Sequence, residues 1–396
     1  MSTKPGFIII AVYLAVALFF AYQSYSNPYF PGNFDSRATT AKPPAIFPND
    51  RARDALNSSP HSRDSFCFAH ISDVHIGSTK ANISDIKYAI DSINLIHPAF
   101  VLSTGDFTDH GYWEEYDEYV KIISLFEVPV FTIQGNHERL SDPFLLSYHR
   151  FFGPANNYSF YFGNNQFVAL DTAVPRRGSG FVKDGALRWL RGELNGSALT
   201  KTVFTHHGIF GDINTSTPFL FVFKGLPDIR EGRDDLLRIM LESNVTMMLS
   251  GHEHANYEKK YENTTFLVTT TFGEGPFEPN IFYGPKKIWN QYEEVYPGYR
   301  LVCINQSNIA FNEVAKMRDI NYTTAFSGNR TVLKIKNEFK NDYPYAILKM
   351  NVPDCSSGYR LRSPNAEVIG SDGCAVLVRT NLTAGEEKTV ALEKTA

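Results

Sequence analysis

The sequence predicts an α/β fold, a sandwich of strands and helices, followed by a small all-β region that is itself sandwich-like. The chain has 396 residues, 43% of them hydrophobic, which is enough for a sizeable core and for two domains. From Phe66 onward, short apolar runs alternate with segments of helical spacing, as in α/β proteins. After about residue 314 the helical spacing fades and short strand-like runs remain.

The N-terminal end carries an uncharged apolar run, Phe7–Tyr22, preceded by the single cation Lys4. The run is slightly shorter than the roughly 20 residues of a membrane span. Bulky Phe19, Phe20 and Tyr22 stand where a cleavable signal peptide needs small residues. We therefore expect an uncleaved signal anchor and a single-pass membrane protein whose remaining chain is extracellular or lumenal. A cleaved signal and a secreted protein are the alternative.

Acceptor motifs for N-glycosylation agree with export. With 28 Asn and 54 Ser plus Thr, chance would give about four Asn-x-Ser/Thr motifs. The chain has eleven, at Asn57, Asn82, Asn157, Asn195, Asn214, Asn244, Asn263, Asn305, Asn321, Asn329 and Asn381. The excess predicts a glycoprotein, although we expect motifs inside strands to stay unmodified.

Composition and cysteines narrow the class of partner. The net charge is −4 and no strongly basic stretch occurs, so no nucleic-acid partner is expected and a nuclease is disfavoured. In an oxidising compartment Cys355 and Cys374 could close a local loop. Cys67 and Cys303 lie in apolar runs, where buried thiols are as probable as a bridge. There is no CxxC motif, so the cysteines do not predict a metal site.

Residues 26–62 are rich in Pro, Ser and Asn and have no sustained periodicity, which predicts an extended linker. The predicted organisation is an anchor over residues 1–25, this linker, an α/β domain over 63–313 and a C-terminal β domain over 314–396.

Strands and helices alternate through the α/β domain. The predicted strands are 66–71, 100–103, 128–133, 166–172, 201–206 and 245–250. Apolar residues at spacings of three and four predict helices around Ile83–Ile93 and Trp113–Ile123, and two more at 186–194 and 234–243. The β domain has short strands at 331–337, 345–352, 366–370, 374–380 and 388–393.

Five polar clusters stand directly after apolar strands, and together they hold six of the 11 histidines. In chain order they contain Asp73 and His75, Asp106 and Asp109, Asn136 and His137, His206 and His207, and His252 and His254. Ligands of open α/β sheets bind beyond the carboxyl ends of the strands, so these side chains are expected at one rim. Any one cluster is more often turn or cap chemistry, but five in this arrangement predict a site.

With these motifs the sequence resembles the calcineurin-like metallophosphoesterase superfamily over about residues 66–312. The matching motifs are D-x-H, G-D-x-x-D, G-N-H-E, a histidine cluster and G-H-x-H, in the family's order. The resemblance implies a four-layer α-β-β-α sandwich and two divalent or trivalent ions, Mn, Fe, Zn or Co. Carried over, one ion would be held by Asp73, His75, Asp106 and His254, and the other by Asp106, Asn136, His206 and His252.

The resemblance also implies the chemistry, hydrolysis of a phosphoester by a metal-activated hydroxide. His137 would protonate the leaving oxygen, and Asp109 would pair with His137. Asp109 as a plain helix cap is the alternative. The choice of His206 over His207 stays open, because the proline that marks the ligand in the family is missing. Purple acid phosphatases have a tyrosine where this chain has Asp109, so a tyrosinate–iron centre is not expected.

Substrate choice is less constrained. Two aromatic segments, 208–233 and 271–298, should overhang the rim and could contact a base or a lipid tail, or simply pack as a lid. We expect a membrane-anchored phosphoesterase for a small-molecule or lipid phosphomonoester or phosphodiester. The alternative is a metal-binding scaffold or interaction protein of the same fold without hydrolase activity, with partners of the β domain unknown.

Overall fold

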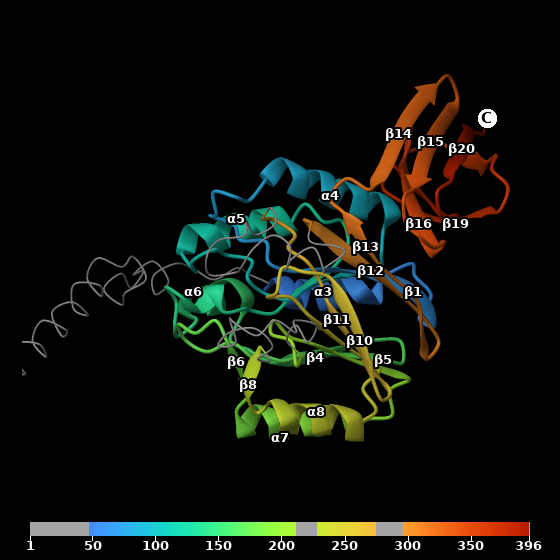
Figure 1. Cartoon of the computed structure of the whole chain (residues 1–396). Coiled ribbons are helices and arrows are strands. Elements are labelled where there is room, and N and C mark those ends of the chain that lie inside the picture. The colour runs from blue at the N-terminus through green and yellow to red at the C-terminus, as the bar shows by residue number, and fades with distance from the viewer. Residues whose placement is uncertain (1–46, 211–227, 275–295, 396) are drawn as a thin grey trace, which may run out of the picture.

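Two β-sheets face each other at the centre of the molecule, with helices on both outer sides (Figure 1). The computed structural model describes residues 47–210, 228–274 and 296–395. One sheet has the strand order β13-β12-β1-β2-β3, and the other has the order β10-β11-β9-β7-β5-β4. The strands that precede the polar clusters, β1, β2 and β3 in one sheet and β7 and β9 in the other, run parallel within each sheet.

The first sheet comprises β1 (Ser65–Ile71), β2 (Val101–Ser103), β3 (Val130–Thr132), β12 (Gly298–Asn305) and β13 (Asn308–Lys316). The second comprises β4 (Tyr158–Phe162), β5 (Asn165–Ala169), β7 (Thr200–Phe204), β9 (Met247–Ser250), β10 (Tyr257–Tyr261) and β11 (Thr264–Val268). A short pair, β6 (Gly180–Phe181) and β8 (Ile229–Glu231), lies apart. The helices are α3 (Pro48–Asn57), α4 (Ile83–Ile96), α5 (Trp113–Ile123), the 3₁₀ turn η1 (His137–Arg139), α6 (Leu146–Phe152), α7 (Asp184–Glu193) and α8 (Arg233–Glu242).

Strand β1 shows why the layers form. Its side chains alternate between the two faces of the sheet, because successive residues of a strand point to opposite sides. Phe66 and Phe68 join the aromatic core between the sheets, whereas Cys67 and Ala69 join the core beneath α4 and α5. A third core lies between the second sheet and α7 and α8. The predicted α/β sandwich is therefore confirmed for the described residues.

The C-terminal region forms two further sheets, one of β14 (Ile320–Ser327), β15 (Arg330–Asn337), β20 (Glu387–Lys394) and β17 (Tyr359–Leu361), the other of β16 (Tyr343–Asn351), β19 (Ala375–Leu382) and β18 (Ala366–Asp372). The predicted all-β region is thus confirmed. Its apolar residues continue the core beneath α4, so it packs against the α/β sandwich (Figure 1).

Two of the predicted domain boundaries differ from the structure, because each falls at or near a helix or strand that the sequence pattern did not indicate. Strand β13 runs through Lys316 as part of the first sheet, past the predicted domain boundary at 313/314. Residues 48–57, predicted as part of an extended linker, form helix α3, and that prediction is wrong for them. The amide of Asn49 exchanges two hydrogen bonds with the backbone of Thr132, which holds α3 against β3.

Both pairs of cysteines are disulfide-bonded. Cys355–Cys374 closes the local loop that was predicted, and Cys67–Cys303 joins directly opposed residues of β1 and β12. The predicted anchor over residues 1–25 lies outside the described residues. Within the described part of the chain, every helix is too short or too polar to cross a membrane.

Candidate metal centre

The five polar clusters lie in the loops that follow β1, β2, β3, β7 and β9. Five of the predicted ligands have backbone φ angles in the left-handed region, namely Asp73, His75, Asp106, His252 and His254, with φ between 48° and 70°. Residues with side chains seldom adopt this conformation unless their surroundings enforce it, and such residues gather at functional sites. The loops are therefore folded to aim these side chains rather than to follow local preference.

One group of ligand atoms joins the first and last clusters. The Nε2 atoms of His75 and His254 are 3.1 Å apart, and Nε2 of His254 lies 3.3 Å from a carboxylate oxygen of Asp73. All three side chains are buried. The structure thus brings together three of the four residues assigned to the first ion.

A second group forms around His206. Its Nε2 lies 3.1 Å from Oδ2 of Asp106 and 3.0 Å from Oδ1 of Asn136. Its Nδ1 lies 2.8 Å from the carbonyl oxygen of Thr104, which can only accept, so Nδ1 carries the hydrogen. In the neutral ring Nε2 then holds the lone pair, which is the arrangement of a metal-ligating histidine.

Asp106 connects the two groups. Its carboxylate, that of Asp73 and the imidazole of His206 offer ligand atoms within 4.8 Å of one another. Asp106 also accepts a hydrogen bond of 2.8 Å from the backbone N–H of His137. This central position is the one that a bridging carboxylate requires.

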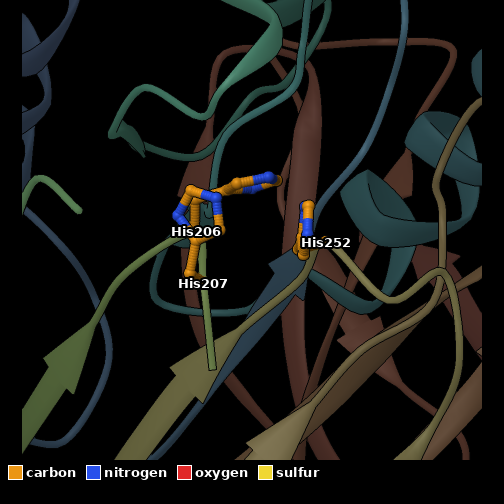
Figure 2. A group of neighbouring side chains, drawn as sticks. All are labelled: His206, His207 and His252. Atoms are coloured by element: carbon orange, nitrogen blue, oxygen red, sulfur yellow. The ribbon is translucent and has the colours of Figure 1, made fainter. Parts of the chain in front are cut away.

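Figure 2 shows His206, His207 and His252 gathered at the loops after β7 and β9. The ring centroid of His252 lies 5.1 Å from that of His206 and 4.6 Å from that of His207. The backbone N–H of His252 donates to the carboxylate of Asp73, at 3.0 Å. His207 turns its Nδ1 to the hydroxyl of Thr172, at 2.9 Å. Contact with Asp106 and Asn136 therefore distinguishes His206 from its neighbour.

His137 sits beside the two groups and is held mainly by a backbone atom. Its Nδ1 lies 2.6 Å from the carbonyl oxygen of Asp109 and 3.8 Å from the Asp109 carboxylate, while its Nε2 lies 3.8 Å from Asp106. The Asp109 carboxylate instead contacts Nδ1 of His75, at 3.3 Å, and Nδ1 of His110, at 3.2 Å. The expected pairing of Asp109 with His137 thus takes a different form, with the carbonyl as the nearer partner.

The cap of α5 is made by another residue. The carboxylate of Glu115 accepts hydrogen bonds from the backbone N–H groups of His110 and Tyr112, at 2.9 and 3.0 Å. The alternative that Asp109 is a plain helix cap therefore has no support in the structure.

Glu138 is a site residue whose role the sequence did not reveal. Its buried carboxylate accepts from the backbone N–H groups of Asp106, Thr108 and Gly135, at 2.9, 2.8 and 2.6 Å. It thereby ties the loop after β2 to the loop after β3. The only sequence signal for this role is that Glu138 is the last residue of the G-N-H-E motif. A glutamate buried there would need several hydrogen-bond donors from the neighbouring loops.

The electrostatics of the site favour the charged forms of Asp106 and Asp109. Burial alone would raise the pKa of Asp106, but the imidazoles of His206 and His137 hold it well below its ordinary value. Burial would likewise raise the pKa of Asp109, and the imidazoles of His75, His110 and His137 lower it. Burial lowers the pKa of His137, yet Asp106 and the Asp109 carbonyl raise it above its ordinary value overall.

The donor set fits transition-metal ions. Imidazole nitrogens, carboxylates and an amide oxygen converge within contact distance, and this mixture suits Mn, Fe, Zn or Co. Glycines permit the convergence, because a Cβ at Gly135 would overlap the Asp106 carboxylate and one at Gly251 would overlap Ser72 and Asp73. Asp73 and Asp106 are both buried, and bound cations would compensate their charges alongside the neighbouring imidazoles.

The aromatic segments expected at the rim are described only at their ends. Residues 211–227 and 275–295, with most of the aromatic side chains, lie outside the described residues. Phe210 packs on Phe266, with ring centroids 4.8 Å apart, and Nζ of Lys259 lies 3.9 Å from its ring. Phe210 therefore packs against the second sheet, as in the lid interpretation.

Comparison with known proteins agrees with this geometry. Residues 67–256 match the family model of the calcineurin-like phosphoesterases. The chain is 31% identical over 152 residues to a probable glycerophosphodiester phosphodiesterase of Arcobacter nitrofigilis, an alignment covering 35% of this chain and 55% of that protein. It is 23% identical over 236 residues to a probable cyclic nucleotide phosphodiesterase of Coxiella burnetii, covering 57% of this chain and 91% of that protein.

Solved structures that align with the chain include a purple acid phosphatase from yellow lupin, at 15% identity and a TM-score of 0.47, covering 70% of this chain and 52% of that one. GAP50 of Plasmodium, described as the anchor in the inner membrane complex, aligns at 15% identity and a TM-score of 0.43, covering 64% of this chain and 89% of that one.

Proposed function

The chain belongs to the calcineurin-like phosphoesterases, whose family model matches residues 67–256, and we propose that it is a phosphodiesterase that uses two transition-metal ions. The family is one of phosphoric ester hydrolases, and the curated relatives named above are phosphodiesterases. The alignment covers little more than half of the first of them. The choice of a diester over a monoester is therefore our proposal.

The observation that carries the proposal is the convergence of two ligand groups on one shared carboxylate. Asp106 lies against His206 and Asn136 and is close to Asp73, which in turn contacts His254. A metal-binding scaffold without hydrolase activity would keep the shared carboxylate but would not need an oriented acid beside it. We assign Asp73, His75, Asp106 and His254 to one ion, and Asp106, Asn136, His206 and His252 to the other.

Two such ions would supply Lewis acidity and a hydroxide nucleophile at neutral pH. The chain's own contribution to the leaving group comes from His137. Its Nδ1–H donates to the Asp109 carbonyl, so the ring presents Nε2 to the site, 3.8 Å from Asp106. In the charged ring Nε2 carries a proton that it can transfer to the departing oxygen. The raised pKa of His137 favours this charged form.

We propose further that the enzyme works outside the cytosol. The apolar run over residues 1–25 and the excess of glycosylation motifs support an N-terminal anchor with the enzyme on the extracellular or lumenal side, and a glycoprotein. The division into a linker that ends before α3, an α/β domain and a β domain remains part of this proposal, with the last boundary moved to the turn between β13 and β14.

The test is metal-dependent turnover of a diester and a monoester in parallel. The full chain is stripped with a chelator, reloaded with Mn, Fe, Zn or Co, and assayed with bis-p-nitrophenyl phosphate and p-nitrophenyl phosphate. We expect turnover only after reloading, and a higher kcat/KM for the diester. A higher value for the monoester would overturn the choice of substrate, and no turnover with any metal would favour the scaffold alternative.

A further inference from the structure

The glycosylation motifs that the structure describes fall on accessible asparagines. Of the ten acceptor asparagines that the structure describes, nine are exposed, one is part-buried and none is buried. Among the thirteen other described asparagines five are buried, namely Asn49, Asn136, Asn165, Asn256 and Asn337. The acceptor motifs therefore select accessible asparagines, which mere chance occurrence of Asn-x-Ser/Thr would not do.

Five of the exposed acceptors lie at the ends of elements that lead away from the metal centre. Asn57 is the last residue of α3, and Asn195 and Asn244 follow the ends of α7 and α8. The next strands along the chain after these three asparagines are β1, β7 and β9. Asn263 is in the turn between β10 and β11, and Asn305 ends β12 opposite Ser65, the first residue of β1.

These five positions share one edge of the sandwich. The metal centre is at the carboxyl ends of β1, β7 and β9, whereas the five asparagines stand at the amino ends of β1, β7, β9 and β11, which is parallel to β9. The seven residues of β1 span roughly 20 Å. A glycan on any of the five would therefore leave the mouth of the site open.

Exposed apolar side chains lie near two of the same acceptors, Asn195 and Asn263. Tyr161, Leu199 and Tyr261 are 53%, 44% and 39% exposed. Tyr261 is two residues before Asn263. A Cβ added at Gly196, which follows Asn195, would lie 3.5 Å from the Tyr161 hydroxyl. The apolar face of a sugar stacks on aromatic rings of this kind, so the edge suits an attached glycan.

The two acceptors near the catalytic rim differ. The Asn82 side chain caps α4, with its carbonyl oxygen accepting from Ser84 and Asp85 and its amide nitrogen donating to Asp85 at 2.9 Å. The part-buried Asn157 accepts from the backbone N–H of Asp171 at 2.7 Å. Their amides are used within the fold. Asn305 at the edge is also engaged, since its Oδ1 accepts from the Ser65 hydroxyl at 2.9 Å, so position in the fold is what sets the edge group apart.

From this segregation we infer that Asn57, Asn195, Asn244, Asn263 and Asn305 carry N-linked glycans, which cover the edge opposite the metal centre. The inference rests on the proposed export of the chain, but not on its hydrolase activity. It adds to the proposed function a polar, sugar-covered edge on the side away from the described ligand loops.

Site-by-site occupancy tests the inference. The full chain is produced in cultured eukaryotic cells and treated with peptide N-glycosidase in H₂¹⁸O, which marks each occupied asparagine as labelled aspartate for mass spectrometry. We expect labelling at the five edge positions above that at Asn82 and Asn157. Changing all five to Gln should lower the glycosidase-dependent mass shift by the glycans of those five positions, and any remaining shift would come from the other acceptors, among them Asn214, Asn321, Asn329 and Asn381. The matched N82Q/N157Q variant should keep the wild-type shift.

An unlabelled edge, whether in an exported chain or in one that stays in the cytosol, would overturn the inference, as would labels confined to Asn82 and Asn157. Turnover of bis-p-nitrophenyl phosphate is measured on the same preparations. The five-Gln variant should keep the wild-type kcat/KM, since none of these residues lies at the metal centre. A chain that lacks glycans at the edge but hydrolyses the diester would contradict this inference alone. A chain that carries these glycans but shows no turnover would contradict the proposed function alone.

Discussion

At the scale of single residues, the division of labour between His137 and the ligands can be measured. His137 donates through Nδ1 to a backbone carbonyl and offers Nε2 to the leaving oxygen. We predict that His137→Ala lowers kcat by roughly 10²–10⁴-fold while the metal content stays at the wild-type value. The loss should be larger for a glycerophosphodiester, whose alkoxide needs a proton, than for bis-p-nitrophenyl phosphate, whose phenolate needs little help.

Asp106→Asn is the matched comparison, because it changes the shared carboxylate and should release metal as well as activity. Metal is counted by atomic emission after gel filtration. Equal metal loss in the two variants, or an equal loss of rate on both substrates in His137→Ala, would contradict the assignment of His137 as acid.

Asp109 provides a second residue-scale prediction. Its backbone carbonyl, which the substitution Asp109→Asn leaves in place, is the nearer partner of His137, and its carboxylate contacts His75 and His110. We therefore expect Asp109→Asn to reduce kcat less than His137→Ala does, in the same diester assay. A loss as large as that of His137→Ala would show that the carboxylate, 3.8 Å away, is what orients the ring.

The residue types and their positions after strands were sufficient to predict the ligand set as a hypothesis, because each motif combines a glycine or serine with a metal-binding side chain. The roles of Glu138 and of the Asp109 carbonyl could not be predicted in this way. They depend on which backbone groups the loops after β2 and β3 bring together, and a sequence pattern does not specify that.

At the scale of elements, the loops after β2 and β3 touch through glycine. Gly135 does not have a positive φ angle, so its backbone conformation does not exclude alanine. The Cβ of an alanine there would, however, overlap the Asp106 carboxylate and backbone. We predict that Gly135→Ala loses one ion and most turnover while its circular dichroism spectrum stays native. Gly185→Ala in α7, where a Cβ meets nothing within 4 Å, is the control and should keep both. Full metal content in Gly135→Ala would refute the close approach of these loops.

Strong apolar periodicity predicted helices correctly, but weak periodicity did not mean that a segment lacks a helix. Helix α4 was predicted because its isoleucines form an apolar stripe that is buried on the first sheet. Helix α3 was missed because only Asn49, Ala52 and Leu56 are buried, and one of these is polar. Asn49 is fixed by a partner 83 residues away, Thr132, so tertiary contact rather than local pattern decides this helix.

At the scale of the whole molecule, stability should depend on buried histidines far from the metal centre. Burial lowers the pKa of His61 from 6.5 to about 3, with the His97 carbonyl bond opposing it and nearby positive charge adding to it. Between those values the unfolded chain binds a proton that the folded chain does not. The free energy of unfolding therefore falls as the pH falls below 6.5, and it is unaffected above that value.

We predict that wild type loses about 2 kcal/mol more than His61→Gln between pH 7 and pH 5. Glutamine can still donate to the His97 carbonyl, so the variant removes the titration and keeps the hydrogen bond. Urea unfolding of both proteins at the two pH values measures the difference. Metal released from the centre in acid lowers the stability of both proteins alike. Equal losses of unfolding free energy in wild type and His61→Gln would therefore show that His61 does not titrate in this range.

The central claim concerns the whole site, that one carboxylate shared by two loop systems holds a pair of metal ions. Anomalous diffraction from crystals of the manganese-loaded protein tests it most directly. We predict two peaks about 3.5–4 Å apart that flank Asp106, with His75 and His254 on one and Asn136 and His206 on the other. A single peak, or two peaks that do not share Asp106, would contradict the account.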